Sequence, residues 1–128
     1  MREILFRGKR IDNGELVEGN LIRYINGGAA ILELAGLRIH FVNPDTVCQF
    51  TGLKDRNGQK IFEGDILLPP GEEDAHIRLV VEFKDYAWKL RWLGRESSFN
   101  HYLSNWDGEI YKVIGNIYDN PELLKKEA

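Results

Sequence analysis

Two stretches of this chain, residues 6–22 (FRGKRIDNGELVEGNLI) and residues 50–67 (FTGLKDRNGQKIFEGDIL), repeat one pattern of glycine, asparagine and apolar residues. The first parts of the two stretches match at an offset of 44 residues, and the later parts match at an offset of 45. Both contain an Asn-Gly pair, which tolerates positive φ at the two central positions of a turn and so favours a β-hairpin. The repeat therefore predicts two similar β-hairpin units. Asn13-Gly14 and Asn57-Gly58 should lie in exposed turns, and the segments that flank them should superpose.

A second glycine follows each Asn-Gly pair, at a position expected to lie within a strand. Gly19 and Gly64 are therefore expected to mark a β-bulge or a close approach of two backbones. Asp65, directly after Gly64, is expected to accept hydrogen bonds from nearby backbone amides and so to fix a bend.

The oxygen-bearing residues around the second turn also raise the hypothesis of a calcium loop. Asp55 and Asn57 are two residues apart, and Glu63 follows them. An EF-hand loop needs oxygen ligands at positions 1, 3 and 5, glycine at position 6 and glutamate at position 12. Counted from Asp55, the glycine falls at position 4 and Glu63 at position 9. These residues are therefore expected to fold the chain, and no metal site is predicted.

The rest of the chain is rich in short apolar stretches separated by turn residues. Further strands are predicted at residues 16–25, 29–34, 37–42, 46–50, 77–83, 86–93 and 109–118. Residues 97–104 have the spacing of a short helical turn, and Asn120-Pro121-Glu122 has the composition of a helix start.

The fold class that these patterns predict is mainly β. Antiparallel hairpins are expected to form a small barrel-like or sandwich core from two similar β units, with a short C-terminal helix. Residues 1–128 are expected to form a single compact domain. Two lobes are the alternative division, with the first hairpin unit at about residues 1–45 and the second unit plus the C-terminal helix at about residues 46–128.

Composition and charge exclude several classes of protein. The formal net charge is −3 and the pI is about 5.6, whereas a dedicated nucleic-acid binder usually carries a basic excess. No apolar stretch approaches the ~18 residues that cross a bilayer, and residues 1–10 lack the apolar core of a secretory signal. No membrane partner is therefore expected, and the expected location is the cytoplasm. Cys48 is the only cysteine, which excludes a disulfide within the chain.

No set of residues in the sequence predicts catalysis. Cys48 would need a neighbouring base such as His40 to act as a nucleophile, and a lone cysteine is more often a small buried residue. Glu63 and Asp65 are close enough in sequence for acid–base work, but capping of backbone amides explains them more simply. The three histidines, His40, His76 and His101, do not have metal-ligand spacing. The chain is therefore expected not to be an enzyme, with no catalytic residue, cofactor, metal or small-molecule substrate.

Five blocks in the same order resemble the YopX family, whose members are small proteins of temperate phages and prophages. The blocks are residues 6–9 (FRGK), 42–47 (VNPDTV), 51–55 (TGLKD), 63–66 (EGDI) and 114–123 (IGNIYDNPEL). The resemblance implies a mainly β fold with barrel-like parts beside a smaller mixed region, and it brings no activity or catalytic residue to this chain. Cys48 stands where a small residue, often glycine, is expected in the family.

The function that these observations favour is that of a phage or prophage accessory protein which acts through a protein partner or as a homo-oligomer. A chain of short strands must protect its sheet edges, and pairing an edge with a second subunit is a common way to do so. The C-terminal residues 121–128 add Leu123 and Leu124 as a small apolar surface.

The alternative function is a nucleic-acid-binding β-barrel module that uses the basic region 76–106. Its candidate contact residues are Arg78, Lys89, Arg91 and Arg95. A single-strand-binding surface needs cations and aromatic rings on one face. Alternation along residues 86–93 instead places Trp88 and Trp92 on the face opposite Lys89 and Arg91, so both indoles are expected to be largely buried.

Overall fold

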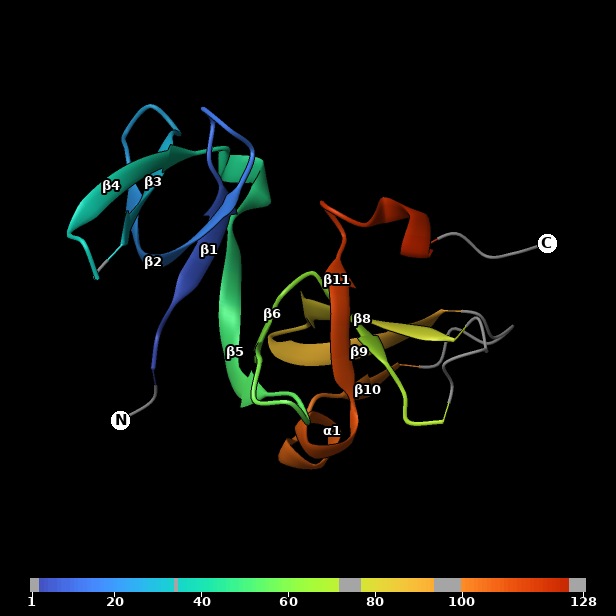
Figure 1. Cartoon of the computed structure of the whole chain (residues 1–128). Coiled ribbons are helices and arrows are strands. Elements are labelled where there is room, and N and C mark those ends of the chain that lie inside the picture. The colour runs from blue at the N-terminus through green and yellow to red at the C-terminus, as the bar shows by residue number, and fades with distance from the viewer. Residues whose placement is uncertain (1–2, 34, 72–76, 94–99, 125–128) are drawn as a thin grey trace. The chain divides into compact units, whose positions relative to one another are not determined.

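The computed structural model describes residues 3–33, 35–71, 77–93 and 100–124 (Figure 1). The described chain is mainly β, with two antiparallel sheets, as the sequence predicts. It divides into two compact units, Met1–Phe50 (unit 1) and Thr51–Ala128 (unit 2), and each is described by itself.

Unit 1 holds the first strands of a six-stranded antiparallel sheet in the order β4-β3-β2-β1-β5-β6, whose last strand, β6 (Lys60–Phe62), belongs to unit 2. Its strands are β1 (Phe6–Lys9), β2 (Leu16–Arg23), β3 (Ala29–Glu33), β4 (Arg38–Val42) and the first part of β5 (Cys48–Lys54), with the 3-10 helix η1 (Pro44–Thr46) between β4 and β5. Asn43 starts this helix because its side chain accepts the Asp45 N–H at 3.0 Å.

The core of unit 1 lies on one face of this sheet. It is built from Val17, Ala29, Ile31 and Val42, with Phe6, Leu21 and Val47 packed against them. Gly19 lies within β2, and a Cβ at this position would stand 2.0 Å from the backbone oxygen of Leu32 on β3. The predicted close approach of two backbones at Gly19 is therefore confirmed.

The sheet of unit 1 does not close into a barrel. The Ile11 N–H donates to Phe41 O at 3.0 Å and the Asn43 N–H donates to Lys9 O at 2.8 Å, and these bonds flank a single bridge between Arg10 and Val42. The end of β1 is thus joined to the end of β4 by one bridge and not by a ladder. Both strand orders are open among the described residues, so the expected barrel-like arrangement is wrong.

Unit 2 holds a second antiparallel sheet in the order β10-β9-β8-β7-β11. Its elements are the end of β5, β6 (Lys60–Phe62), β7 (Asp65–Leu68), β8 (Arg78–Lys84), β9 (Ala87–Leu93), β10 (Asn100–Tyr102), α1 (Asn105–Ile110), β11 (Lys112–Asn116) and the 3-10 helix η2 (Pro121–Leu124). The core of unit 2 consists of Ile61, Leu67, Leu79, Val81, Leu90, Tyr111 and Val113.

Both Asn-Gly pairs lie in exposed turns, which confirms that prediction. Gly14 and Gly58 have φ of +73° and +81°, a region that glycine adopts without strain. The connections are longer than two residues: the Arg10 N–H reaches Glu15 O at 2.8 Å, and the Asp55 N–H reaches Gln59 O at 2.8 Å. The superposition of the flanking segments stays a prediction.

The strand in which Gly64 was expected to lie is broken at this glycine. This glycine has φ of +84° and lies in the turn between β6 and β7, so the prediction that it lies within a strand is wrong. The predicted bend at Asp65 is confirmed, because its buried carboxylate accepts the Phe62 N–H at 2.8 Å.

Three further elements of unit 2 differ from the predictions. The β8–β9 hairpin turns at Asp85 and Tyr86, whose φ values are +54° and +64°. Residues 100–102 form β10 and not a helical turn, and α1 begins at Asn105. The expected C-terminal helix is a single 3-10 turn, η2. No helix among the described residues is long and apolar enough to cross a bilayer.

Candidate interaction surfaces

The sheet of unit 1 is apolar on the side that faces away from its core. The strand register forms two rows there: Ile22, Ala30 and Phe41 in one, and Asn20, Leu32 and Ile39 in the other. Phe41 remains 59% exposed and Ile39 54% exposed. An antiparallel sheet with one face on a core usually carries polar residues on its other face. The apolar members of these rows together with Tyr24, which continues β2, are called the outer face.

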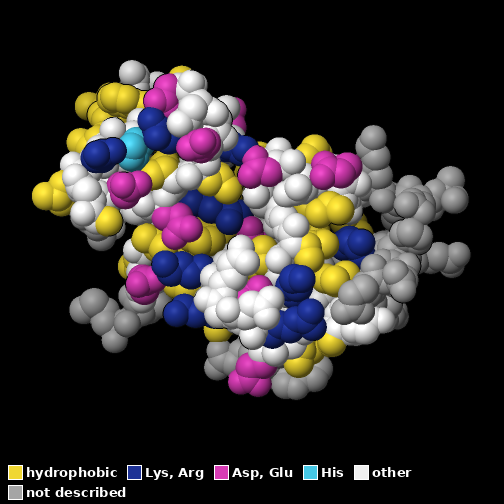
Figure 2. Space-filling model, viewed as in Figure 1, with side chains coloured by type: hydrophobic (Ala, Val, Ile, Leu, Met, Phe, Trp, Pro, Cys, Tyr) yellow, Lys and Arg dark blue, Asp and Glu magenta, His cyan; other side chains and the backbone are white. Residues whose placement is uncertain are grey.

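Tyr24 and Phe41 form the centre of the outer face. Their rings are stacked, with centroids 6.0 Å apart and planes 30° apart. Figure 2 shows hydrophobic side chains reaching the surface of unit 1 among charged ones. Large exposed apolar patches that are rimmed by polar residues mark protein–protein contact sites in soluble proteins.

Two hollows adjoin Phe41 and share Ile11, which is 68% exposed. The first, of about 260 Å³, is lined by Arg10, Ile11, Asp12, Ile39, His40 and Phe41. The second, of about 360 Å³, is lined by Ile11, Tyr24, Asn26, Gly28, Ala29, Phe41, Val42 and Pro44. An apolar side chain from another protein surface could enter either hollow.

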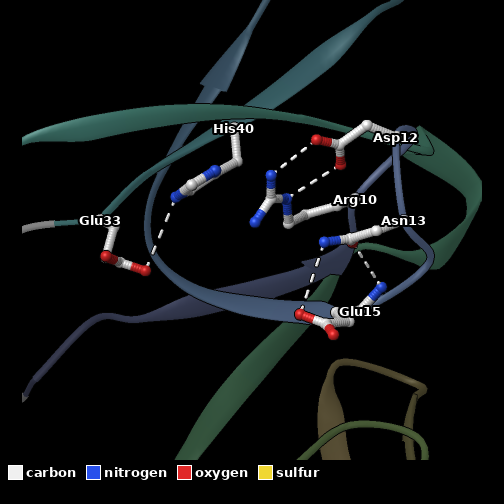
Figure 3. Close-up of polar contacts among 6 residues, drawn as sticks. All are labelled: Arg10, Asp12, Asn13, Glu15, Glu33 and His40. Carbon is white, nitrogen blue, oxygen red and sulfur yellow. Dashed lines mark hydrogen bonds and ion pairs between the residues drawn. The ribbon is translucent and has the colours of Figure 1, made fainter.

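An ion pair borders the first hollow. The Arg10 guanidinium contacts both carboxylate oxygens of Asp12, with Nε donating to Oδ1 at 3.0 Å and Nη2 donating to Oδ2 at 2.6 Å (Figure 3). This bidentate hydrogen bond lowers the pKa of Asp12 and raises the pKa of Arg10. The pair fixes the loop between β1 and β2 beside the hollow.

Three more polar contacts connect residues around this hollow. His40 Nε2 lies 3.6 Å from Glu33 Oε2, so the imidazole on β4 points to the carboxylate on β3 (Figure 3). In the β1–β2 loop, Asn13 Oδ1 accepts the Glu15 N–H at 2.9 Å and Asn13 Nδ2 donates to Glu15 Oε2 at 3.4 Å.

The described cations of the nucleic-acid hypothesis lie in unit 2 and are bonded within the chain. Lys89 Nζ lies 3.1 Å from Asp85 Oδ2, and Arg91 Nε donates to Glu82 Oε1 at 2.6 Å. Arg78 Nη1 donates to Ile77 O at 2.8 Å. Arg95 lies outside the described residues. The structure therefore brings Lys89 and Arg91 onto one face of β9, each beside a carboxylate.

The tryptophans of β9 lie on its core-facing side. Trp88 and Trp92 both pack against the core of unit 2, which confirms that they share a side, although they are only partly buried. The exposed aromatic residue on the face of Lys89 is Tyr102, which is 67% exposed and has the Lys89 Nζ 5.4 Å from its ring centroid. Sequence reasoning missed Tyr102 because it assigned residues 97–104 to a helical turn.

A chain of polar contacts in unit 2 braces β9, β10 and the start of α1. Trp92 Nε1 donates to His101 Nδ1 at 2.9 Å, and His101 Nε2 lies 3.1 Å from Asp107 Oδ1. The Ser104 hydroxyl donates to the other oxygen of the buried Asp107 carboxylate at 3.1 Å. A nucleophilic triad needs the imidazole between serine and carboxylate. Here the carboxylate stands between them, and the arrangement is that of a structural brace.

The other residues considered for chemistry also have structural partners. The Asp55 carboxylate accepts the N–H groups of Asn57 and Gln59, and Cys48 is buried with its Sγ 3.5 Å from Thr46 O. The small buried role expected of Cys48 is confirmed. His40 lies in unit 1 and His101 in unit 2, while His76 lies outside the described residues. Across the described ranges, no three histidine, cysteine, aspartate or glutamate side chains gather as metal ligands.

The fold and its surfaces define a class of two-unit, antiparallel β proteins with an apolar sheet face in the first unit. The family model described as YopX protein matches residues 5–125, and the chain belongs to this family. The resemblance drawn from the five sequence blocks is thereby confirmed.

Two solved structures are similar to the chain along its whole length. Protein EF1440 from Enterococcus faecalis is 28% identical, with 98% of this chain and 100% of that chain covered and a TM-score of 0.57. YopX from Bacillus subtilis is 18% identical, with full coverage of both chains and a TM-score of 0.59, which shows the fold alone. No curated protein matches the sequence.

Proposed function

We propose that this YopX-family protein is a non-enzymatic accessory protein of phage or prophage type. It works in the cytoplasm by burying the outer face of unit 1 against another protein surface. The observation that carries the proposal is the exposure of Phe41 and Ile39 on a sheet face where polar residues are the rule. The neighbouring hollows add concave apolar surface, and Ile11 extends it.

The polar contacts support a binding role over a catalytic one. Arg10 forms an ion pair with Asp12, and the His40 imidazole lies 3.6 Å from the Glu33 carboxylate, so these polar groups position the β1–β2 loop and β4. Protein–protein interfaces usually have an apolar centre and a polar rim, and the outer face with its bordering charged residues has the same arrangement.

Radical footprinting tests whether the outer face is covered in cells. The protein is exposed to hydroxyl radicals in producing cells and as a dilute purified sample, and oxidation of Tyr24 and Phe41 is compared by mass spectrometry. Oxidation is normalised to Tyr86 of unit 2, which is 97% exposed and lies outside the proposed surface. We expect the normalised oxidation of Phe41 to fall severalfold in cells. Equal oxidation in both samples would refute the proposal.

A second candidate function rests on Tyr102. Its exposed ring lies beside Lys89, on the sheet face that also holds Arg91, so a cation and a stacking surface occur together. The charge of this surface counts against the function, because Lys89 pairs with Asp85 and Arg91 pairs with Glu82.

Fluorescence anisotropy of a labelled single-stranded oligonucleotide at low salt distinguishes this second function. Binding that weakens severalfold in Tyr102→Ala, and that is lost on combining Lys89→Glu with Arg91→Glu, would support it. An unchanged anisotropy with the wild-type protein at low salt would remove it.

A further inference from the structure

Three Asn-Gly pairs of the chain lie at exposed turns: Asn13-Gly14, Asn26-Gly27 and Asn57-Gly58. An asparagine that precedes glycine is open to an intramolecular reaction, in which the glycine backbone nitrogen attacks the side-chain carbonyl carbon of the asparagine. Glycine favours this reaction because it has no side chain that would hinder the attack. The same chemistry is therefore offered three times in one molecule, and the structure decides where it proceeds fastest.

The attacking nitrogen is held alike in the three turns. Each glycine N–H donates to one backbone carbonyl of its turn, at 2.9 Å for Gly14 and at 3.0 Å for Gly27 and Gly58. The three glycines also have similar φ values, of +73°, +91° and +81° in the same order. The nitrogen that would attack therefore does not distinguish the three sites.

The asparagine side chains differ from one turn to the next. Asn13 is held at both ends, because its Oδ1 accepts the Glu15 N–H at 2.9 Å and its Nδ2 donates to Glu15 Oε2 at 3.4 Å. Asn26 is held at one end, where its Oδ1 accepts the Gly28 N–H at 2.9 Å. Within the described part of the chain, the Asn57 side chain makes no hydrogen bond. Its carbonyl carbon can turn toward the following nitrogen without breaking a side-chain bond.

We propose that Asn57 is a site of spontaneous modification, at which the side-chain amide becomes a carboxylate. The Gly58 nitrogen forms a bond to Asn57 Cγ, the Cγ–Nδ2 bond breaks, and the proton of the Gly58 nitrogen leaves with Nδ2 as ammonia. Water then opens the resulting succinimide ring at one of its two carbonyl carbons. One product is aspartate. The other is isoaspartate, in which the backbone runs through the former side chain and is one carbon longer.

The modified linkage lies inside the turn that Asp55 closes. Asp55 Oδ1 accepts the Asn57 N–H at 2.9 Å and the Gln59 N–H at 2.8 Å, and these two groups lie on either side of the linkage. An extra backbone carbon between them changes their spacing, so that one oxygen no longer accepts both. The second oxygen of Asp55 accepts the Val113 N–H at 2.9 Å. Isoaspartate at this position therefore loosens the attachment of the turn to β11 and weakens unit 2 as the protein ages.

Peptide mapping by mass spectrometry measures the reaction at all three sites in one sample. The purified full chain is kept in mildly alkaline buffer and digested with pepsin in acid, and the acid form of each peptide is quantified. We expect conversion at Asn57 to exceed conversion at Asn26 severalfold, with Asn13 the slowest. In concentrated urea, where the turns are lost, the three rates should converge. Equal rates in the folded protein, no conversion at Asn57, or the same ranking in urea would overturn the assignment.

A second measurement tests the consequence for unit 2. Anion exchange separates aged molecules that have gained a negative charge, and tryptophan fluorescence follows the urea unfolding of the fraction in which mapping finds Asn57 converted. We expect this fraction to unfold at a lower urea concentration than the fresh protein. Asn57→Gln is the matched control: it keeps an amide that would have to close a larger ring, so after the same ageing it should unfold as it does when fresh. A converted fraction that unfolds at the same urea concentration as the fresh protein would overturn the predicted loosening.

Discussion

The carboxylate of Asp55 accepts the backbone N–H of Val113 at 2.9 Å, across 58 residues of sequence. Its other oxygen accepts the N–H groups of Asn57 and Gln59 at 2.9 and 2.8 Å. One buried side chain therefore closes the turn after β5 and attaches it to β11 within unit 2. The residue that most resembled a calcium ligand in the sequence organises the backbone of the fold.

Replacing Asp55 with alanine should strongly destabilise unit 2. The substitution leaves backbone donors without an acceptor in a buried position, and each such group costs about 1–3 kcal/mol. We expect the free energy of unfolding in urea to fall by about 3 kcal/mol or more. Tryptophan fluorescence monitors this transition, because unit 2 holds all three tryptophans.

Asp12→Ala is the matched control for Asp55→Ala, since it removes a carboxylate from the corresponding loop of the first hairpin. Asp12 is exposed and bonds to Arg10 at the surface, so the free energy of unfolding should hardly change. An equal loss in the free energy of unfolding in the two variants would mean that Asp55 does not hold the turn after β5 and β11 together.

Gly19→Ala should prevent the sheet of unit 1 from forming as described. The added Cβ would stand 2.0 Å from Leu32 O, which is backbone and can move only if β2 and β3 separate. Overpacking of a core already costs about 1–3 kcal/mol, and a clash with backbone should cost more. Far-ultraviolet circular dichroism and urea unfolding measure the loss. In Gly36→Ala the Cβ meets only the flexible Arg38 side chain at 3.5 Å or more, so this control should fold normally.

Tyr111 should make the protein sensitive to alkali. Burial, followed by the charge of Asp107, raises the pKa of Tyr111. Because the folded-state pKa lies above the unfolded value of about 10, the stabilising contribution is complete below that pH and is lost as the pH rises past it. In Tyr111→Phe, the decline in the free energy of unfolding above about pH 10 should be shallower. Tyr86→Phe, at an exposed position, should decline as the wild type does; the same slope in all three proteins would contradict the prediction.

Several local features of the backbone could be predicted from the residues that form them. The positive φ of Gly14 and Gly58, the close approach at Gly19 and the bend at Asp65 each depend on a few neighbouring residues, so the sequence alone predicted them. The strands predicted at residues 77–83 and 86–93 imply a turn at Lys84 and Asp85. The observed turn lies one residue later, at Asp85 and Tyr86, because these residues adopt positive φ without a glycine to indicate it.

The outer face could not be predicted because it depends on strand register. The segment Ala29–Glu33 is apolar at both alternating sets of positions, so its pattern does not show which side faces the core. Pairing with β2 and β4 places Ile31 in the core and aligns Ala30, which is itself fully buried, with the exposed Phe41 on the other side of the sheet. Likewise, Tyr102 joins Lys89 only because β10 pairs with β9, a pairing that the helical spacing of residues 97–104 concealed.

Sedimentation equilibrium of the wild type and of Phe41→Glu tests most directly whether the outer face joins two copies. The chain has a mass of 14.8 kDa. We expect the wild-type mass to approach twice this value as the concentration rises, and Phe41→Glu to stay at the mass of one chain because a charge would be buried in the interface. Tyr102→Glu, which changes a similarly exposed ring in unit 2, should behave as the wild type does. The prediction would be contradicted by a wild type that keeps the mass of one chain at every concentration. It would also be contradicted by a Phe41→Glu variant that dimerises as well as the wild type.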